Sequence, residues 1–237
     1  MSLALAHKRR IQADGPAAEG ASAAAVVYSA ATALASPANA KKHLKLMEDA
    51  LAQDLERLSA IDNLGLRQQL KRDELVPKYL DYVQRYRDSG LSFPNPVVMQ
   101  VLVWLFDTEQ FEAGLDLANF AMEQGQPMPE RFKRNVQTFV ADAVIEWAEA
   151  EQKAGRSPEP YVSDLLPRVD DEWQLTEQIP AKYHKLLGIR ALDAKEWVNA
   201  IAHFERATEL HAGVGVGTRL EGARKALAKQ LAVTAAE

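Results

Sequence analysis

Apolar residues recur along most of this chain at spacings of three and four, which is the period of an amphipathic helix. The first clear helix follows Ser36, which can cap it, and Pro37, whose missing N–H costs nothing at a first helical position. Its apolar stripe consists of Leu44, Met47, Leu51, Leu55 and Leu58. This stripe is either a face of the core or a narrow seam against a second subunit.

A second helix is predicted over "RQQLKRDELVPKYLDYVQRYRDSG", ending near Gly90. Tyr79, Tyr82 and Tyr86 share one face of it, with basic residues close by. Such an arrangement can hold nucleic acid by stacking and charge. It also suits half-buried core tyrosines whose hydroxyls reach water, which is the more common case.

Residues 103–125, "VWLFDTEQFEAGLDLANFAMEQG", read as the end of one helix, a tight turn and a new helix. Asn95 and Pro96 open the first of these helices. Asp107 is expected to cap the second, with Gln110 reaching back to complete the cap. The small residues that let the two backbones approach are Gly114, Ala118 and Ala121.

A long helix is predicted over "PMPERFKRNVQTFVADAVIEWAEAEQKAG", followed by a short helical piece, "YVSDLLP", and an acidic loop, "RVDDEWQ". The stretch after residue 178 has the tetratricopeptide spacing of two antiparallel helices, carried by Leu187, Gly188, Ala191, Ala200, Phe204 and Ala207. Asp193 with Glu196, and Thr218 with Glu221, are expected to form capping boxes for the last two helices.

The pattern therefore predicts an all-α fold of helical hairpins, tetratricopeptide-like near the C-terminus, behind a disordered N-terminal tail. We expect a disordered basic tail at 1–35, N-terminal helices at 36–90, a central hairpin and long helix at 91–155, and tetratricopeptide-like helices at 156–237. The 36–90 segment is the candidate for DNA binding and oligomerisation. The side chains expected to be buried are Trp104, Phe111, Phe139, Trp147, Leu187 and Phe204.

Composition narrows the class of protein further. The chain has 237 residues, no cysteine and no apolar run approaching the roughly 20 residues of a membrane helix. We therefore expect a cytoplasmic protein without disulfides or a membrane partner. Residues 1–45 hold six basic and two acidic side chains, a net charge of +4, which leaves −9 for the remainder. A basic arm on an acidic body is typical of a tail that contacts phosphates, although a solubilising leader would look the same.

No catalytic or cofactor motif stands out. The five histidines form no HExxH pattern, and the glycines of "GVGVG" follow no predicted strand, so a phosphate loop is not indicated. Asp170, Asp171 and Glu172 could suggest a metal nuclease, but such sites need carboxylates converging from separate elements. We therefore expect no catalytic residue, no metal site and no cofactor, and interpret this acidic stretch as solvated.

From Lys71 to Leu210 the sequence resembles the small terminase subunits of peduovirus-type tailed phages. The resemblance is carried by "KRDELVPKYLDYV", Trp104, Asp107, Ala118, Ala121, Gly125, "MPERFKR", "KLLG" and "AIAHFERATEL". It implies a protein that recognises viral DNA ends and presents the DNA to the large ATPase and nuclease subunit, for genome packaging and cohesive-end cleavage. It also implies a homo-oligomer acting in the host bacterial cytoplasm.

The partners implied are thus double-stranded phage DNA, the terminase large subunit and further copies of this chain. The candidate phosphate contacts are Lys8, Arg9, Arg10, Lys41, Lys42 and Lys45, with Arg131, Lys133 and Arg134 as a second patch. The candidate oligomer contact is the stripe from Leu44 to Leu58. Family members are often named endonuclease subunits, so a metal-dependent endonuclease stays open as an alternative, as does a helical-repeat adaptor without a DNA role.

Overall fold

A computed structural model describes residues 33–234 of the chain. Within that range the secondary structure is helical throughout, with turns between the helices and no strand, which confirms the all-α prediction. No helix in this range is long and apolar enough to cross a membrane. The predicted disordered tail lies outside the described residues except at its very end, and the four-segment division of the chain stays a prediction.

The described residues fall into two compact units, which meet between Leu46 and Met47 of the sequence. The first contains the short helix η2 (Ala33–Ala35) and the beginning of α2 (Pro37–Ser59). The Ser36 hydroxyl accepts a hydrogen bond from the Asn39 N–H at 3.3 Å, so the predicted cap is confirmed.

The second unit begins with the remainder of α2, followed by α3 (Leu64–Leu70), η3 (Lys71–Leu75) and α4 (Val76–Asp88). Asp54 of α2 is nearly buried and accepts hydrogen bonds from Lys78 Nζ and the Tyr79 hydroxyl, both at 2.6 Å. These two contacts satisfy the charge of the carboxylate and fix α2 against α4.

The helix predicted from Arg67 onward begins at Leu64 and is continuous through α3, η3 and α4, but one turn of it is a π-helix. The Val76 N–H bonds back to the Lys71 carbonyl, five residues away. Pro77 comes directly afterwards and has no N–H to give to the preceding turn, so the wider turn absorbs the missing bond.

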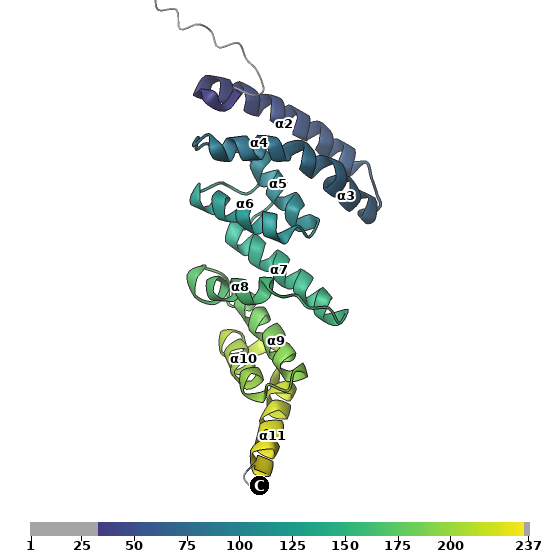
Figure 1. The fold of residues 1–237 in the computed structure, drawn as a ribbon, viewed down its shortest axis with the longest axis vertical. Helices are drawn as coiled ribbons and strands as arrows, with labels where there is room; N and C mark the ends of the chain where they lie inside the picture. The colour runs from purple at the N-terminus through teal and green to yellow at the C-terminus, as the bar shows by residue number, and fades with distance from the viewer. Residues whose placement is uncertain (1–32, 235–237) are drawn as a thin grey trace, which may run out of the picture. The chain divides into compact units, whose positions relative to one another are not determined.

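The central hairpin consists of α5 (Pro96–Asp107) and α6 (Phe111–Glu123), which lie side by side (Figure 1). Asn95 caps α5 as predicted, by accepting from the Val98 N–H at 3.3 Å. The predicted cap at Asp107 is wrong. Asp107 is still the last residue of α5, and its carboxylate instead accepts from Lys71 Nζ at 2.7 Å.

The long helix α7 (Val136–Lys153) begins later than its sequence predicts. Asn135 caps it through the Thr138 N–H at 2.9 Å, and the residues from Pro127 to Arg134 are not helical. The short helix α8 (Tyr161–Pro167) is present as predicted. The expected acidic loop after it begins with a π-helical turn, η4 (Arg168–Glu172).

The C-terminal hairpin of α9 (Gln178–Asp193) and α10 (Trp197–Leu210) is followed by η5 (Ala212–Val214) and α11 (Gly217–Thr234) (Figure 1). Its helices approach closely because Gly188 lies under the Phe204 ring. The predicted capping box of Asp193 is wrong, since Asp193 ends α9 and accepts from Gln152 Nε2 at 3.0 Å. The geometry of this pair is consistent with a tetratricopeptide-like unit.

The two hairpins turn in the same way. In the first turn the Gln110 N–H bonds to the Leu105 carbonyl, and in the second the Glu196 N–H bonds to the Ala191 carbonyl, each five residues back. Glu109 and Lys195 hold the same left-handed position in these turns, at φ 60° and 61°. Consequently Phe111 and Trp197 occupy equivalent positions, each as the first residue of the second helix.

The core predicted from sequence is largely confirmed. Trp104, Phe111, Phe139 and Phe204 are buried, whereas Trp147 and Leu187 are only half-buried. Phe111 packs on the Trp147 ring at 4.7 Å between centroids, which links the first hairpin to α7.

The contact at Gly188 gives a direct test of the C-terminal hairpin. A Cβ at Gly188 would lie 2.6 Å from Cδ1 of Phe204, so Gly188→Ala is expected to destabilise the fold by about 1–3 kcal/mol through overpacking. The matched control is Gly222→Ala in α11, where a Cβ would meet no atom within 4 Å and helix propensity favours alanine. Chemical denaturation measures both variants, and an unchanged midpoint for Gly188→Ala would contradict the close approach.

Candidate nucleic-acid interface

The first group of predicted phosphate contacts is only partly within the described residues. Lys8, Arg9 and Arg10 lie outside them. Lys41, Lys42 and Lys45 are positioned in the first turns of α2, and neither Lys41 nor Lys42 forms an ion pair with another described residue. Lys41 and Lys42 are exposed, and contact of this group with phosphates stays a prediction.

The second predicted patch is less accessible to a phosphate. Arg131 donates to Gln100 Oε1 at 2.8 Å and lies over the Phe132 ring, and Arg134 is ion-paired with Asp142. All three residues are exposed, but only Lys133 has no partner among the described residues. A phosphate would therefore have to compete with contacts that two of the three side chains already make.

The predicted oligomer stripe runs from the first unit into the second. Within the second unit, Leu51 and Leu58 are buried in a single chain, with 6% and 7% of their surfaces exposed. Burial of these two side chains favours a role in the core, and the subunit contact stays a prediction. The remaining members, Leu44, Met47 and Leu55, are half-buried.

The part of the chain that follows the basic N-terminal arm is itself divided into an acidic segment and a basic segment. Residues 46–177 hold 13 basic and 25 acidic side chains, a net charge of −12, whereas residues 178–234 hold nine basic and five acidic ones, a net charge of +4. Several cations of the latter segment have no ion-pair partner among the described residues. They are Lys182, Lys195, Arg219, Lys225 and Lys229.

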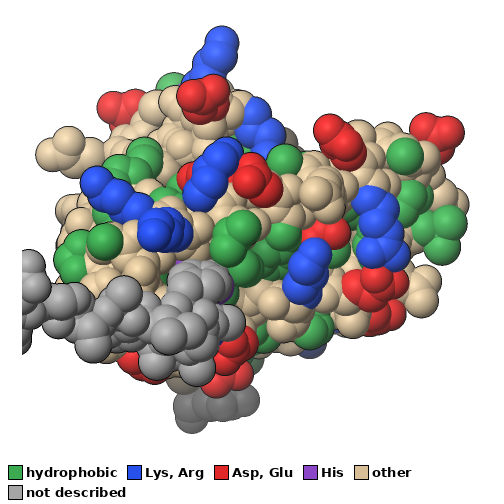
Figure 2. All heavy atoms as spheres, turned by 90° about the horizontal axis from the view of Figure 1, so that it is seen from above, with side chains coloured by type: hydrophobic (Ala, Val, Ile, Leu, Met, Phe, Trp, Pro, Cys, Tyr) green, Lys and Arg blue, Asp and Glu red, His purple; other side chains and the backbone are tan. Residues whose placement is uncertain are grey.

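This basic C-terminal segment was not among the sequence predictions. The signal was present in the sequence, because a charge count in successive windows separates it from the acidic middle. On the face drawn in Figure 2, by contrast, basic and acidic side chains are interspersed and hydrophobic side chains lie exposed between them. The described side chains visible there form no patch of a single sign.

A polar cluster ties η4 to the C-terminal hairpin. Asp170 is ion-paired with Arg206 at 3.0 Å and lies 3.3 Å from His184 Nε2. The Nδ1 atoms of His184 and His203 are 2.9 Å apart, so one of the two rings donates and the other accepts. The expectation that Asp170 belongs to a solvated loop is therefore wrong, although Asp171 and Glu172 are exposed.

The protonation of this cluster depends on burial and charge. Burial alone would raise the pKa of Asp170, but hydrogen bonds and charges from Arg206 and His184 outweigh it and hold that pKa below its usual value. Burial lowers the pKa of His184 against the opposing pull of Asp170. It also lowers the pKa of His203, and the charge of His184 adds to that effect.

The cluster does not bring together a metal-ligand set. Among residues 33–234, no group of three or more histidine, aspartate or glutamate side chains is placed to hold a metal ion. His184 and His203 face each other through Nδ1, while Asp170 contacts the opposite side of the His184 ring. The arrangement can share a proton and neutralise a half-buried carboxylate, which are structural tasks.

These features define an all-helical, charge-divided protein built from hairpins. A family model described as phage small terminase subunit matches residues 49–178, and the chain belongs to that family. It is 33% identical, over 189 residues, to a protein named probable terminase, endonuclease subunit, of Haemophilus phage HP1; the match covers 74% of this chain and 67% of the relative. It is 28% identical to the terminase, endonuclease subunit, of Escherichia phage P2, over 72% of this chain and 69% of the relative.

No solved structure shows significant similarity to the chain. Membership of the family gives the protein a role in phage DNA packaging, a process that involves DNA and the large terminase subunit.

The histidine pair predicts a pH dependence of stability. Because the pKa of each histidine is lowered in the fold, the unfolded chain takes up protons first as pH falls below the ordinary value of 6.5. The free energy of unfolding should therefore decrease between about pH 7 and 5. Replacing His184 and His203 with glutamine should flatten this decrease, whereas His211→Gln should not. Parallel curves for all three proteins in urea denaturation would contradict the assignment.

Proposed function

We propose that this protein recognises the ends of viral DNA and presents the DNA to the large terminase subunit in the host cytoplasm. That subunit carries the ATPase and nuclease that package the genome and cut its cohesive ends. The observation that carries the proposal is the division of charge within a small terminase subunit, with basic segments at both ends of an acidic chain.

Electrostatics decides where DNA can approach such a chain. A net charge of −12 over residues 46–177 repels a duplex, and net charges of +4 on each flanking segment attract it. The N-terminal group consists of two sets of three cations, which are Lys8, Arg9 and Arg10, and Lys41, Lys42 and Lys45. It supplies phosphate contacts, which hold and orient a duplex without reading its sequence.

Oligomerisation belongs to the same proposal. An oligomer of this chain would place several basic segments along one DNA molecule. This would raise the avidity of the oligomer for DNA without any new kind of contact. Leu44, Met47 and Leu55 are the members of the stripe that retain exposed surface for a second copy. Leu51 and Leu58 are buried within the subunit and offer little surface for such a contact.

A second candidate is a metal-dependent endonuclease, which the names of the two relatives favour. Asp171 and Glu172 are exposed and could bind a metal ion together with groups from another subunit. Magnesium-dependent nicking of DNA by the isolated protein would support this candidate over DNA presentation alone.

The DNA proposal predicts a change in salt dependence. Each phosphate contact steepens the slope of log affinity against log salt by about 0.9, so alanine at all six N-terminal basic positions should lower the slope by up to about 5. Binding is measured across a salt series with cohesive-end and random duplexes, and both should weaken alike.

Two other results would contradict the assignment to the N-terminal group. An unchanged slope would exclude the group, and the same experiment with alanine at Arg131, Lys133 and Arg134 would then test the second patch. A loss confined to the cohesive-end duplex would mean that the N-terminal group reads bases instead of holding phosphates.

A further inference from the structure

The equivalent aromatic residues of the two hairpins, Phe111 and Trp197, differ in how far other rings cover them. Phe111 begins α6 and is covered by the rings of Trp147, at 4.7 Å, and Tyr161, at 5.3 Å. Trp197 begins α10 at the equivalent place, is only half-buried, and has no aromatic neighbour among the described residues. The second hairpin thus has an indole available where the first has a completed cluster of tilted aromatic rings.

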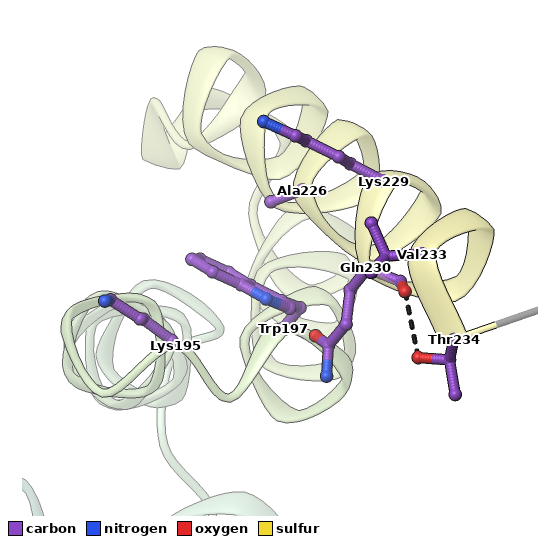
Figure 3. Close-up of a pocket in the computed structure, with 7 residues that line it drawn as sticks. All are labelled: Lys195, Trp197, Ala226, Lys229, Gln230, Val233 and Thr234. Carbon is purple, nitrogen blue, oxygen red and sulfur yellow. Dashed lines mark hydrogen bonds between the residues drawn. The ribbon is translucent and has the colours of Figure 1, made fainter. Parts of the chain in front are cut away.

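Trp197 lies in a groove between the start of α10 and the second half of α11, with a volume of about 500 Å³. Ala226 and Val233 of α11 form an apolar wall of the groove. Lys195 and Lys229 lie on either side of the Trp197 indole (Figure 3). Both lysine side chains extend to the same side as the indole in this view. Among the described residues that line this groove, none carries a carboxylate.

The residues around the groove are exposed, and its two lysines form no ion pair with a described residue. Residues 228–234 of α11 are exposed throughout, and Leu231 and Val233 have 60% and 55% of their surfaces in solvent. Lys195 and Lys229 have no ion-pair partner among the described residues. An aromatic ring, apolar walls and two unneutralised cations therefore meet at one accessible site.

We infer that this groove binds single-stranded DNA, with an unpaired base stacked on Trp197 and the adjoining phosphates held by Lys195 and Lys229. The inference rests on the proposed function, since it assigns the single-stranded part of a DNA end to a site on this subunit. The base would take the place that Trp147 fills over Phe111 in the first hairpin.

The combination of surfaces selects among possible ligands. A blunt duplex keeps its base faces stacked inside and offers phosphates alone, so it has no use for the indole and apolar walls. A single strand presents flat apolar base faces and phosphates together, which is the combination that aromatic-basic grooves recognise. An acidic amphipathic peptide shares part of this chemistry, and measuring DNA affinity alongside association with the large subunit separates the two.

The test uses the full chain and three fluorescently labelled probes: oligothymidylate, a blunt duplex, and the same duplex with a single-stranded overhang. Trp197→Ala should weaken binding of the two probes that contain single strand by about 5- to 100-fold and leave the blunt duplex unchanged. Trp197→Phe, which keeps a stacking ring, should restore most of the affinity. Fluorescence anisotropy reports all three affinities.

The lysines are tested separately with a matched control. Lys195→Ala with Lys229→Ala should lower the salt slope for oligothymidylate by about 1.4, at roughly 0.7 for each phosphate contact with a single strand. The control is Arg72→Ala with Lys153→Ala, which removes two exposed cations that form no ion pair with a described residue. It should leave the slope unchanged, because neither side chain lines the groove.

The outcomes distinguish the inference from the function it rests on. If the unaltered protein binds no DNA probe, the proposed function fails and the inference with it. If it binds duplex normally but Trp197→Ala has no effect on single strand, only the inference is overturned. Loss of association with the large subunit, while all DNA affinities remain normal, would show that the groove holds a protein segment and would also overturn it.

Discussion

The close approach of paired helices at a glycine determines most of this architecture. In the second hairpin the Phe204 ring lies directly on Gly188, and in the first the Phe106 ring lies on Gly114. Helices held this close can be joined by only a few residues, and both connections use the same left-handed turn. That turn then places an aromatic residue, Phe111 or Trp197, at the head of each second helix.

The two hairpins differ in the helices that come after them. The first hairpin continues into α7 and α8, whose Trp147 and Tyr161 complete an interior. The second continues into α11, a helix with mostly exposed residues and a net charge of +3 from four basic and one acidic side chain. The first hairpin is therefore covered by the helices that follow it. The second hairpin is similar in structure but keeps a basic surface that is only partly covered. This difference makes the second hairpin the better candidate for contact with a polyanion.

Local spacing predicted the helices and hairpins well, because apolar periodicity and small residues at crossings reflect packing within neighbouring elements. The caps at Ser36 and Asn95 could be predicted from the sequence for the same reason. Asp107 and Asp193 have the right residue type for a cap, but the preceding helix continues through both. Their carboxylates find partners at Lys71 and Gln152, which are distant in sequence and could not be foreseen.

The candidate site was less predictable, for two physical reasons. Ion pairs such as those of Asp170 and Arg134 depend on tertiary placement, so charge type alone did not show which side chains were already engaged. The net charge of all residues after 45 is negative, so it conceals the positive charge of the C-terminal segment. The groove at Trp197 is open because no aromatic ring of the described residues packs on that indole. A local sequence pattern does not predict such a feature.

Mapping where DNA touches the chain tests the central claim most directly, namely that the basic segments hold DNA while the acidic middle does not. The full-length protein is photocrosslinked to cohesive-end DNA carrying iodouracil in the duplex and in the overhang, and the crosslinked peptides are identified by mass spectrometry. Crosslinks from the duplex should fall within residues 1–45, and those from the overhang within residues 178–234. Crosslinks concentrated within residues 46–177 would contradict the account.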